Sequence, residues 1–434
     1  MRTKRILLIT RYFPPLDSIA TQRMYCWAKY LDRRGYKISV LTTSKKQQII
    51  IPLDLDTSRF EVSELPYFDP IVCIGVDKQS LFSGAAANQV TSGFRERLKQ
   101  RCVRFYRERM NERMPGRTDF WIRPAIQELK RRKRDGITYD FVISSYGPYS
   151  AHIVGHYAKK LFGAVWLADY RDLWLENHTF AGVWPFTTLE RIIESSVVRH
   201  ANLISTVSDP LKDVLQRKFP LVPVYTIENG FDPEAMPTDV PPYFANTQNK
   251  FRIVYTGSIY RNRRDPRPLF QAVQQLLHDG QISEDNFEVL FYGSSMGDLP
   301  ELIREFHLQE IAKHCGTVSS KDALAIQQSA SALLFLEAPN PAIGGILTGK
   351  LFEYLYVDTP IIGVGIGRDS TAGRLITRTG AGVVCGEDVA LIKKGVENIM
   401  EGRDQLKRRY DLIMKYSRRT QADRVAELLE AASY

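Results

Sequence analysis

Residues 344–365 read GGILTGKLFEYLYVDTPIIGVG, in which paired glycines precede a helical run and the apolar segment IIGV indicates a strand. The helical run begins near Thr348 and carries Lys350 and Glu353 three positions apart, so one ligand can touch both side chains. Glycines, a helix start and a lysine together suit a phosphate group. Glu353, one turn on, can accept hydrogen bonds from neighbouring sugar hydroxyls. The stretch predicts a nucleotide site at the start of a helix.

The same spacing also fits a plainer interpretation, in which Lys350 and Glu353 form an ion pair on a solvated helix face. A Walker phosphate loop is excluded, because Leu351 stands where that motif requires Ser or Thr. The organisation of the rest of the chain has to decide between a nucleotide site and a solvated helix.

Short strands alternate with helical stretches along the whole chain. The first series of strands comprises RILLIT, KISVLTTS, DFVISS, AVWLADY, NLISTVS and VYTIENG. A second series follows a stretch with four prolines, FDPEAMPTDVPPYFANTQNK, and comprises FRIVYTG, EVLFYG, ALLFLE, TPIIGV and GVVCG. Two successive series of this kind predict two doubly wound parallel sheets, with ligands bound at the carboxyl ends of the strands.

This organisation predicts four segments in the 434 residues. We expect one Rossmann-like domain over residues 1–233, a linker over 234–250 and a second Rossmann-like domain over 251–403. Residues 404–434 should form helices that pack back on the first domain.

The composition is that of a soluble globular protein, with 44% hydrophobic and 25% charged residues. No apolar run approaches the roughly 18 residues of a membrane span. The opening MRTKRILLITRYFPP is too short in its apolar part for a signal peptide and is expected to form the first strand. The five cysteines are scattered and lack a C-x-x-C pair, which favours a reducing cytoplasm over a structural zinc site.

The net charge of +10 is concentrated in residues 95–134, which hold fifteen Lys/Arg and five Asp/Glu. Residues 95–114 of this segment read as a basic helix with an apolar stripe, which can lie on an anionic membrane surface. A solvated helix packed by the same stripe on its own domain is the alternative. Nucleic-acid binding is not expected, because no recognition motif accompanies the charge. The stripe consists of Leu98, Cys102, Phe105, Tyr106 and Met110.

The order and spacing of several motifs resemble those of GT-B glycosyltransferases of the retaining family 4 type, over nearly the full length. The first half contributes ILLITRYFPP, LDRRGYKISVLT, ISSYGPYSAHIVG and LADYRDLW. The second half contributes IENGFD, IVYTGSIYRNRRDP, GILTGKLFEYLYVDTPIIGVG and TGAGVV. The resemblance implies two Rossmann-like domains that face each other across a cleft.

The resemblance assigns the donor site to the second domain. The family carries two glutamates eight positions apart, of which the second holds the donor ribose and the first contacts the donor sugar. Glu353 matches the second, whereas Gly345 stands in place of the first. Lys350 fits a diphosphate partner. The other donor-site candidates are Thr348, Gly349, Gly257, Ser258 and the arginines of the turn IYRNRRDP, Arg261, Arg263 and Arg264.

The resemblance assigns the acceptor and the groups at the reacting carbon to the first domain. The family often has a histidine after the fifth strand, but this chain has DYRDLW there. The candidates that remain are Asp169, Arg171 and Asp172, for which a structural ion pair is the alternative. Asp172 could orient the acceptor hydroxyl, and the protein would mainly stabilise the leaving diphosphate.

We expect from the resemblance a retaining hexosyltransferase that moves a sugar from a UDP- or GDP-sugar to a glycan or lipid-linked acceptor. Bacterial surface polysaccharide synthesis is the expected setting, in the cytoplasm or peripherally on the inner face of the membrane. No cofactor is expected, and no metal, since His152 and His156 lack further ligands and the DLD at 54–56 lacks a GT-A context. A nucleotide-sugar epimerase or a non-catalytic homologue stays the alternative, because of Gly345.

Overall fold

The computed structural model describes residues 2–16, 18–45, 55–69, 101, 105, 112–176, 182–235, 242–244, 250–259, 264–337, 347–403 and 406–433. The chain divides into two compact units, one made of Met1–Glu228 with Arg418–Tyr434 and the other of Asn229–Ser417. The chain therefore passes between the units twice, and its last helix belongs to the first unit.

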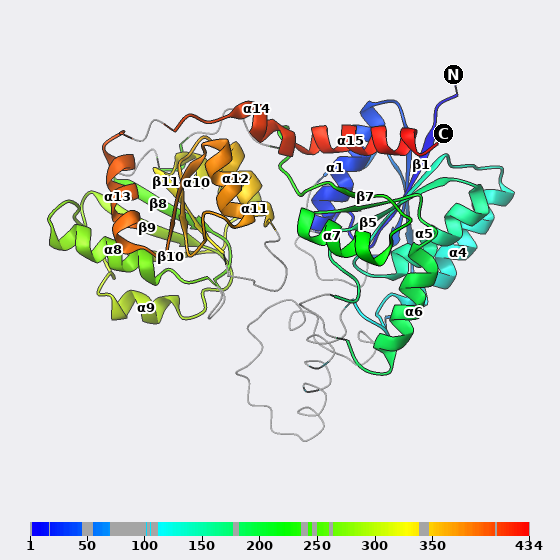
Figure 1. The fold of residues 1–434 in the computed structure, drawn as a ribbon, viewed down its shortest axis with the longest axis horizontal. Helices are drawn as coiled ribbons and strands as arrows, with labels where there is room; N and C mark the ends of the chain where they lie inside the picture. Colours follow the sequence, from blue (N-terminus) through cyan, green and yellow to red (C-terminus); the bar gives the residue numbers. More distant parts are fainter. Residues whose placement is uncertain are drawn as a thin grey trace. The chain divides into compact units, whose positions relative to one another are not determined.

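The first unit is built on a parallel sheet whose described strands follow the order β3-β2-β1-β4-β5-β6-β7 (Figure 1). Ile6 of β1 lies opposite Ile38 of β2 on one side and Phe141 of β4 on the other. The strand order reverses between β1 and β4, which is where doubly wound sheets bind ligands. The strands are β1 (Arg5–Ile9), β2 (Lys37–Thr43), β3 (Glu61–Leu65), β4 (Phe141–Ser145), β5 (Val165–Tyr170), β6 (Leu203–Thr206) and β7 (Val224–Thr226).

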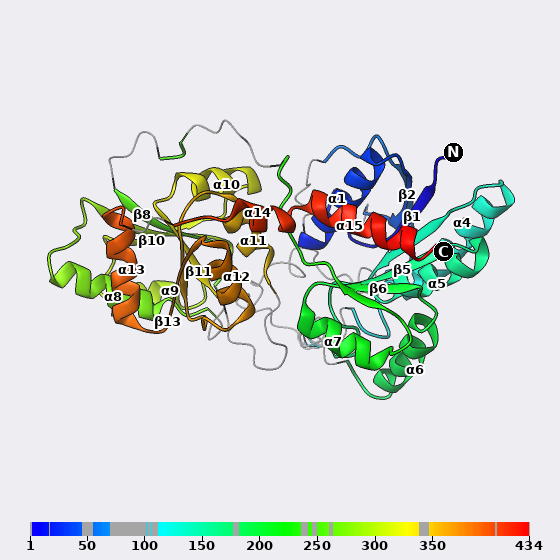
Figure 2. The ribbon, with the colours of Figure 1, turned by 45° about the horizontal axis from the view of Figure 1, so that its top comes forward.

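Helices cover both faces of this sheet, with α1 and α15 side by side on one face and α4 and α5 on the other (Figures 1 and 2). Helix α1 begins where the Ser18 hydroxyl accepts a hydrogen bond from the Thr21 amide, 3.1 Å away. Trp27 of α1 and Leu429 of α15 share one apolar core with β1. The helices are α1 (Ile19–Arg33), α4 (Asp119–Arg134), α5 (Ser150–Phe162), α6 (Phe186–Val198), α7 (Asp209–Lys218) and α15 (Arg418–Ala431).

The second unit repeats this plan with a parallel sheet whose described strands follow the order β10-β9-β8-β11-β12-β13. The order reverses between β8 and β11. The strands are β8 (Phe251–Thr256), β9 (Phe287–Tyr292), β10 (Ala312–Gly316), β11 (Ala332–Leu336), β12 (Ile361–Val364) and β13 (Gly382–Gly386). The helices are α8 (Arg267–His278), α9 (Leu299–Glu305), α10 (Ser320–Ser329), α11 (Gly349–Tyr356), α12 (Thr371–Thr379), α13 (Val389–Met400) and α14 (Tyr410–Ile413).

Successive residues of β8 belong to two different apolar cores. Ile253 and Tyr255 pack in a core that includes residues of α8, α9 and α13. Val254, between them, packs in a core that includes residues of α10, α11 and α12. A strand buried on both faces shows the continuous apolar run that the sequence displays. The predicted pair of doubly wound parallel sheets is confirmed.

The predicted basic helix over residues 95–114 lies largely outside the described residues, so the membrane contact assigned to it stays a prediction. Of residues 95–134, the structure describes Arg101, Phe105 and 112–134, and the last of these ranges contains α4. None of the described helices has both the length and the apolar character needed to cross a membrane.

Candidate functional site

The strongest candidate site lies where the strand order of the second sheet reverses. Gly257 and Ser258 directly follow β8, and Glu337 directly follows its neighbour β11. Helix α11 begins at Gly349, on the connection from β11 to β12. Because the carboxyl ends of parallel strands share one edge, these residues meet at the position where doubly wound sheets bind ligands.

Lys350 is the central side chain of this site. Its Nζ lies 3.7 Å from the centre of the Tyr255 ring, on the ring face. Gly257 has φ +133°, and a Cβ atom there would overlap Nζ, so only glycine leaves room for the ammonium group. Although the residue as a whole is half-buried, Nζ itself is inaccessible and has no hydrogen-bond partner among the described residues. Burial, reinforced by the nearby charge of Arg264, holds the pKa of Lys350 well below its ordinary value, and Glu353 opposes the shift.

Arg264 places a second cation beside Lys350. Its Nη1 donates to the carbonyl oxygen of Ser258 at 2.6 Å and to the hydroxyl of Tyr255 at 3.3 Å. The guanidinium is thereby fixed to the turn that follows β8. Arg261 and Arg263 of the same turn, and Gly345, lie outside the described residues.

The start of α11 is anchored to β8 through Tyr354, whose hydroxyl accepts a hydrogen bond from the Thr256 amide at 3.0 Å. Thr348 occupies the N-cap position, yet within the described part of the chain its side chain makes no capping hydrogen bond. The Leu351 amide instead donates to the Thr348 carbonyl oxygen at 3.1 Å. Glu353, one turn further, is half-buried.

Glu337 belongs to the same neighbourhood, and our sequence analysis missed it. Burial raises the pKa of this half-buried carboxyl to about 7, and the charge of Arg264 opposes the shift. The only signal in the sequence is an acidic residue at the end of the apolar run ALLFLE. The structure thus brings two cations and two carboxylates together with Gly257 and Ser258.

In the first unit, Asp169 is a fully buried member of β5. Its carboxylate accepts hydrogen bonds from Arg23 Nη2 at 2.8 Å, Ser145 Oγ at 2.9 Å and Ser205 Oγ at 2.8 Å. Arg23 is buried as well and lies on α1. This arrangement is a buried ion pair that ties α1 to three strands of the sheet.

Arg171 and Asp172 follow β5 at the carboxyl edge of the first sheet, and their side chains pair at 3.1 Å. The Arg171 guanidinium also lies 3.9 Å from Glu112 and over the Tyr12 ring at 5.1 Å. Tyr12, which follows β1, donates its hydroxyl hydrogen bond to Glu112 at 2.6 Å. Burial and the Glu112 charge raise the pKa of Tyr12. Tyr12 and Glu112 were missed by the sequence analysis, because 100 residues separate them.

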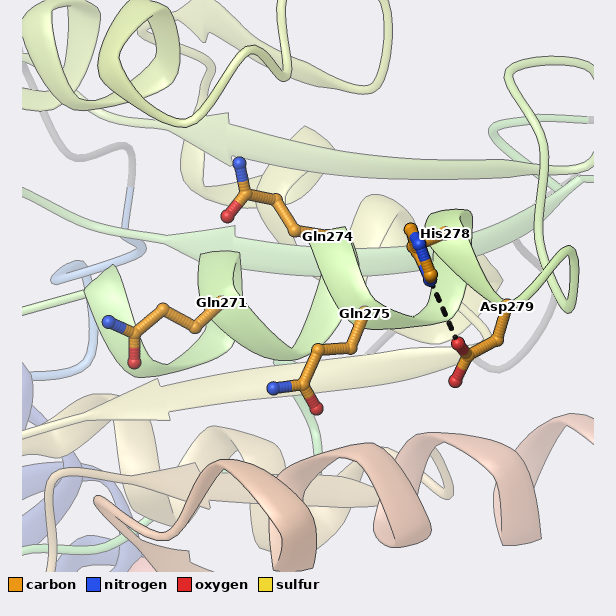
Figure 3. Close-up of a pocket in the computed structure, with 5 residues that line it drawn as sticks. All are labelled: Gln271, Gln274, Gln275, His278 and Asp279. Carbon is orange, nitrogen blue, oxygen red and sulfur yellow. Dashed lines mark hydrogen bonds and ion pairs between the residues drawn. The ribbon is translucent and has the colours of Figure 1, made fainter.

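A separate pocket lies along the outer side of α8 and is lined by polar side chains (Figure 3). His278 and Asp279 interact there at 3.2 Å. Both lie at the end of α8 that is remote from the carboxyl edge of β8, so we assign this pocket no part in the nucleotide site. Its remaining lining residues are Gln271, Gln274 and Gln275.

Comparisons with known proteins show the class of fold. No protein-family model matches the chain, and no curated protein matches it significantly. Among solved structures, a sucrose-phosphate synthase of Thermosynechococcus elongatus superposes with a TM-score of 0.60 at 15% identity, covering 99% of both chains. A UDP-forming α,α-trehalose-phosphate synthase of Burkholderia vietnamiensis gives 0.60 at 9% identity, covering 99% of this chain and 100% of that one.

The lipopolysaccharide outer core galactosyltransferase WaaB gives a TM-score of 0.53 at 11% identity, covering 98% of this chain and 99% of that one. These likenesses extend over both units and establish a GT-B fold. The predicted fold class is thereby confirmed, and at such low identities the likeness concerns the fold alone.

Proposed function

We propose that this protein is a retaining glycosyltransferase that uses a nucleoside-diphosphate sugar as donor. The observation that carries the proposal is the side-chain nitrogen of Lys350, which is inaccessible and has no hydrogen-bond partner among the described residues. An unpaired buried charge is costly in a folded protein unless a ligand compensates it. A diphosphate at the start of α11 would supply that compensation, where the helix dipole also favours an anion.

The other residues of the site suit the remaining parts of such a donor. Arg264, whose guanidinium is fixed by the Ser258 carbonyl, would contact the second phosphate. Glu353 would accept hydrogen bonds from the ribose hydroxyls. Glu337 would accept them from the sugar, the contact that Gly345 cannot provide. We keep Arg261 and Arg263 as further phosphate ligands on the basis of the sequence.

Bond exchange would then proceed at the anomeric carbon of the donor sugar. Its bond to the diphosphate oxygen breaks, the acceptor oxygen bonds to the same face, and the acceptor proton passes to the departing phosphate. Lys350, Arg264 and the start of α11 would stabilise the charge that develops on the leaving group. Asp172 and Arg171 remain our candidates for orienting the acceptor, whereas we assign Asp169 a positioning role through its pair with Arg23.

The acceptor in this proposal is a glycan or a lipid-linked sugar, and the expected setting is the assembly of a bacterial surface polysaccharide at the cytoplasmic side of the membrane. UDP is the first nucleotide to test, because trehalose-phosphate synthase, which shares the fold, is described as UDP-forming. An epimerase is the second candidate, since a UDP-N-acetylglucosamine 2-epimerase from Listeria monocytogenes shares the fold at a TM-score of 0.54 and 11% identity.

Titration of the full chain with UDP and GDP, followed by assays with the matching sugar nucleotides, tests this proposal. A glycosyltransferase should bind one diphosphate and slowly hydrolyse its sugar nucleotide with release of that diphosphate. Conversion of the sugar nucleotide into an epimer without diphosphate release would support the epimerase instead. Failure to bind either nucleotide would refute both.

Replacing Glu337 by alanine should weaken binding of the sugar nucleotide about 10- to 100-fold, because a charged hydrogen bond to a hydroxyl contributes about 1.5–3 kcal/mol. Binding of the bare diphosphate should change by less than about twofold, since it lacks the sugar. Calorimetry with both ligands measures the difference. An equal loss for both ligands would show that Glu337 only positions Arg264.

Turnover is expected to persist in the presence of EDTA. In the proposed site, Lys350 and Arg264 stabilise the leaving diphosphate in the way that a divalent ion does in other transferases. The check is the initial rate before and after EDTA treatment, with Mn²⁺ and Mg²⁺ added back. A rate that vanishes with EDTA and returns with either ion would contradict this role of the two cations.

A further inference from the structure

Helix α6 of the first unit presents an apolar ridge to solvent. Trp184, two residues before the helix, is 80% exposed. Within the helix, the exposed fractions are 37% for Phe186, 46% for Leu189 and 62% for Ile192. The three helix residues follow one another at intervals of three, so they lie on one face. Figures 1 and 2 show α6 at the periphery of the first unit. Four large apolar side chains at neighbouring exposed positions are unusual on a soluble surface.

The acidic residues of α6 are buried in the first unit and paired with basic side chains. Glu190 is fully buried and accepts hydrogen bonds from Arg113 Nε and Nη2 at 3.0 and 2.9 Å and from Trp174 Nε1 at 3.1 Å. Glu194 is also fully buried, and it pairs with Lys218 at 2.5 Å. The outward face of the helix therefore carries no carboxylate.

Cations lie at the end of α6. Arg199, directly after the helix, is exposed, and Lys160 of α5 is exposed nearby. The nitrogen of Lys159 donates to the carbonyl oxygen of His200 at 2.6 Å, which holds the end of α5 against the end of α6. Burial and these surrounding cations lower the pKa of His156 to about 4, which places the cations close to one another on this side of the first unit.

We propose that this surface, Trp184 with the outer face of α6 and the cations at its end, docks on an anionic phospholipid bilayer. Apolar side chains at this density insert between headgroups, exposed tryptophan favours the membrane interface, and arginine and lysine pair with lipid phosphates. An anionic protein partner would match the cations, but it would leave the central Ile192 and the Trp184 indole without an apolar counterpart. The residues of this surface are not among the basic residues 95–114, and the surface does not depend on the proposed donor chemistry.

The distribution of tryptophan makes this surface directly observable. The chain has five tryptophans, and Trp27, Trp121, Trp166 and Trp174 are at most 1% exposed. Fluorescence that an aqueous quencher such as iodide can reach therefore comes from Trp184. Docking on vesicles should protect that fraction from iodide and expose it to brominated lipid. A Trp184→Phe variant, which keeps an apolar ring, should still bind vesicles and lose the signal.

The test is sedimentation of the full chain with vesicles of phosphatidylcholine containing about 30 mol% phosphatidylglycerol, and with neutral vesicles, at several salt concentrations. We expect recruitment that weakens with salt and on neutral vesicles. Ile192→Glu should reduce the partition coefficient more than about tenfold, because it puts a charge at the centre of the ridge. The matched control is Leu221→Glu, at a leucine that is 96% exposed in the segment after α7, and it should leave recruitment unchanged.

Absence of recruitment overturns the proposal. Recruitment that Ile192→Glu does not weaken, or in which Trp184 stays open to iodide, also overturns it and transfers the membrane contact to residues 95–114. Self-association in sedimentation velocity that Ile192→Glu abolishes, without vesicle binding, would show that a second copy covers the ridge.

Discussion

Replacing Asp169 by alanine should destabilise the first unit by about 3–5 kcal/mol, because it leaves the buried Arg23 guanidinium without its carboxylate. Asp169 and Arg23 are both fully inaccessible, and their contact is 2.8 Å. Two serine hydroxyls, of Ser145 and Ser205, would lose their acceptor as well. Losses of this size approach the whole stability of a typical domain.

Urea unfolding followed by tryptophan fluorescence measures this effect in the first unit alone, because all five tryptophans precede residue 185. Asp172→Ala is the matched control. Its side chain is partly exposed, so we expect a stability change within about 0.5 kcal/mol together with reduced turnover. If the Asp169 variant unfolds at the urea concentration of the wild type, the buried pair does not hold the first unit together.

Replacing Lys350 by methionine should weaken nucleoside-diphosphate binding by about 1.5–3 kcal/mol, or one to two decades, and at the same time stabilise the second unit. The two effects have one cause. The ammonium group is inaccessible and unpartnered within the described chain, so the ligand-free protein is more stable without it. Scanning calorimetry measures stability and titration calorimetry measures binding.

Lys394→Met on α13 is the control for that substitution, because this lysine is exposed and lies outside the site. It should change neither binding nor stability appreciably. A Lys350 variant that binds the diphosphate as tightly as the wild type would show that the donor site is elsewhere.

The same lysine should make diphosphate binding depend on pH. Its pKa in the ligand-free protein is well below the ordinary value, so Lys350 is neutral above that lowered pKa. A bound diphosphate favours the charged form and raises the pKa, so binding takes up a proton between the two values. Affinity should therefore be greatest below the ligand-free pKa and fall by up to about tenfold per pH unit above it.

The sequence predicted the two sheets because parallel strands buried on both faces appear as largely apolar runs, as β11 does. Lys350 and Glu353 were predicted from their spacing within one helix. Glu337 was missed, since its meaning depends on Arg264, which the fold brings beside it from a distant turn. A single acidic residue after a strand forms no sequence motif from which a binding site can be predicted.

In the first unit too, side-chain pairs between residues far apart in the sequence could not be predicted. Asp169 was a candidate for catalysis through the family resemblance, but its partner Arg23 lies 146 residues away and on another element. The face of α6 that is buried is likewise decided by Arg113 and Lys218, which reach Glu190 and Glu194 from outside the helix. Local periodicity contains no information about such partners.

The central claim is that burial holds the pKa of Lys350 below its ordinary value until a diphosphate binds beside it, and proton uptake on binding tests it most directly. Titration calorimetry with UDP and GDP in buffers of different ionisation enthalpy, from pH 7 to pH 10, counts the protons that binding takes up. The phosphates are already ionised over most of this range, as a second phosphate pKa of about 6 implies. We predict that the wild type takes up protons on binding at pH values between the lowered pKa of the ligand-free lysine and its pKa in the complex, and that Lys350→Met does not. Absence of binding, or equal uptake in both proteins, would contradict the account.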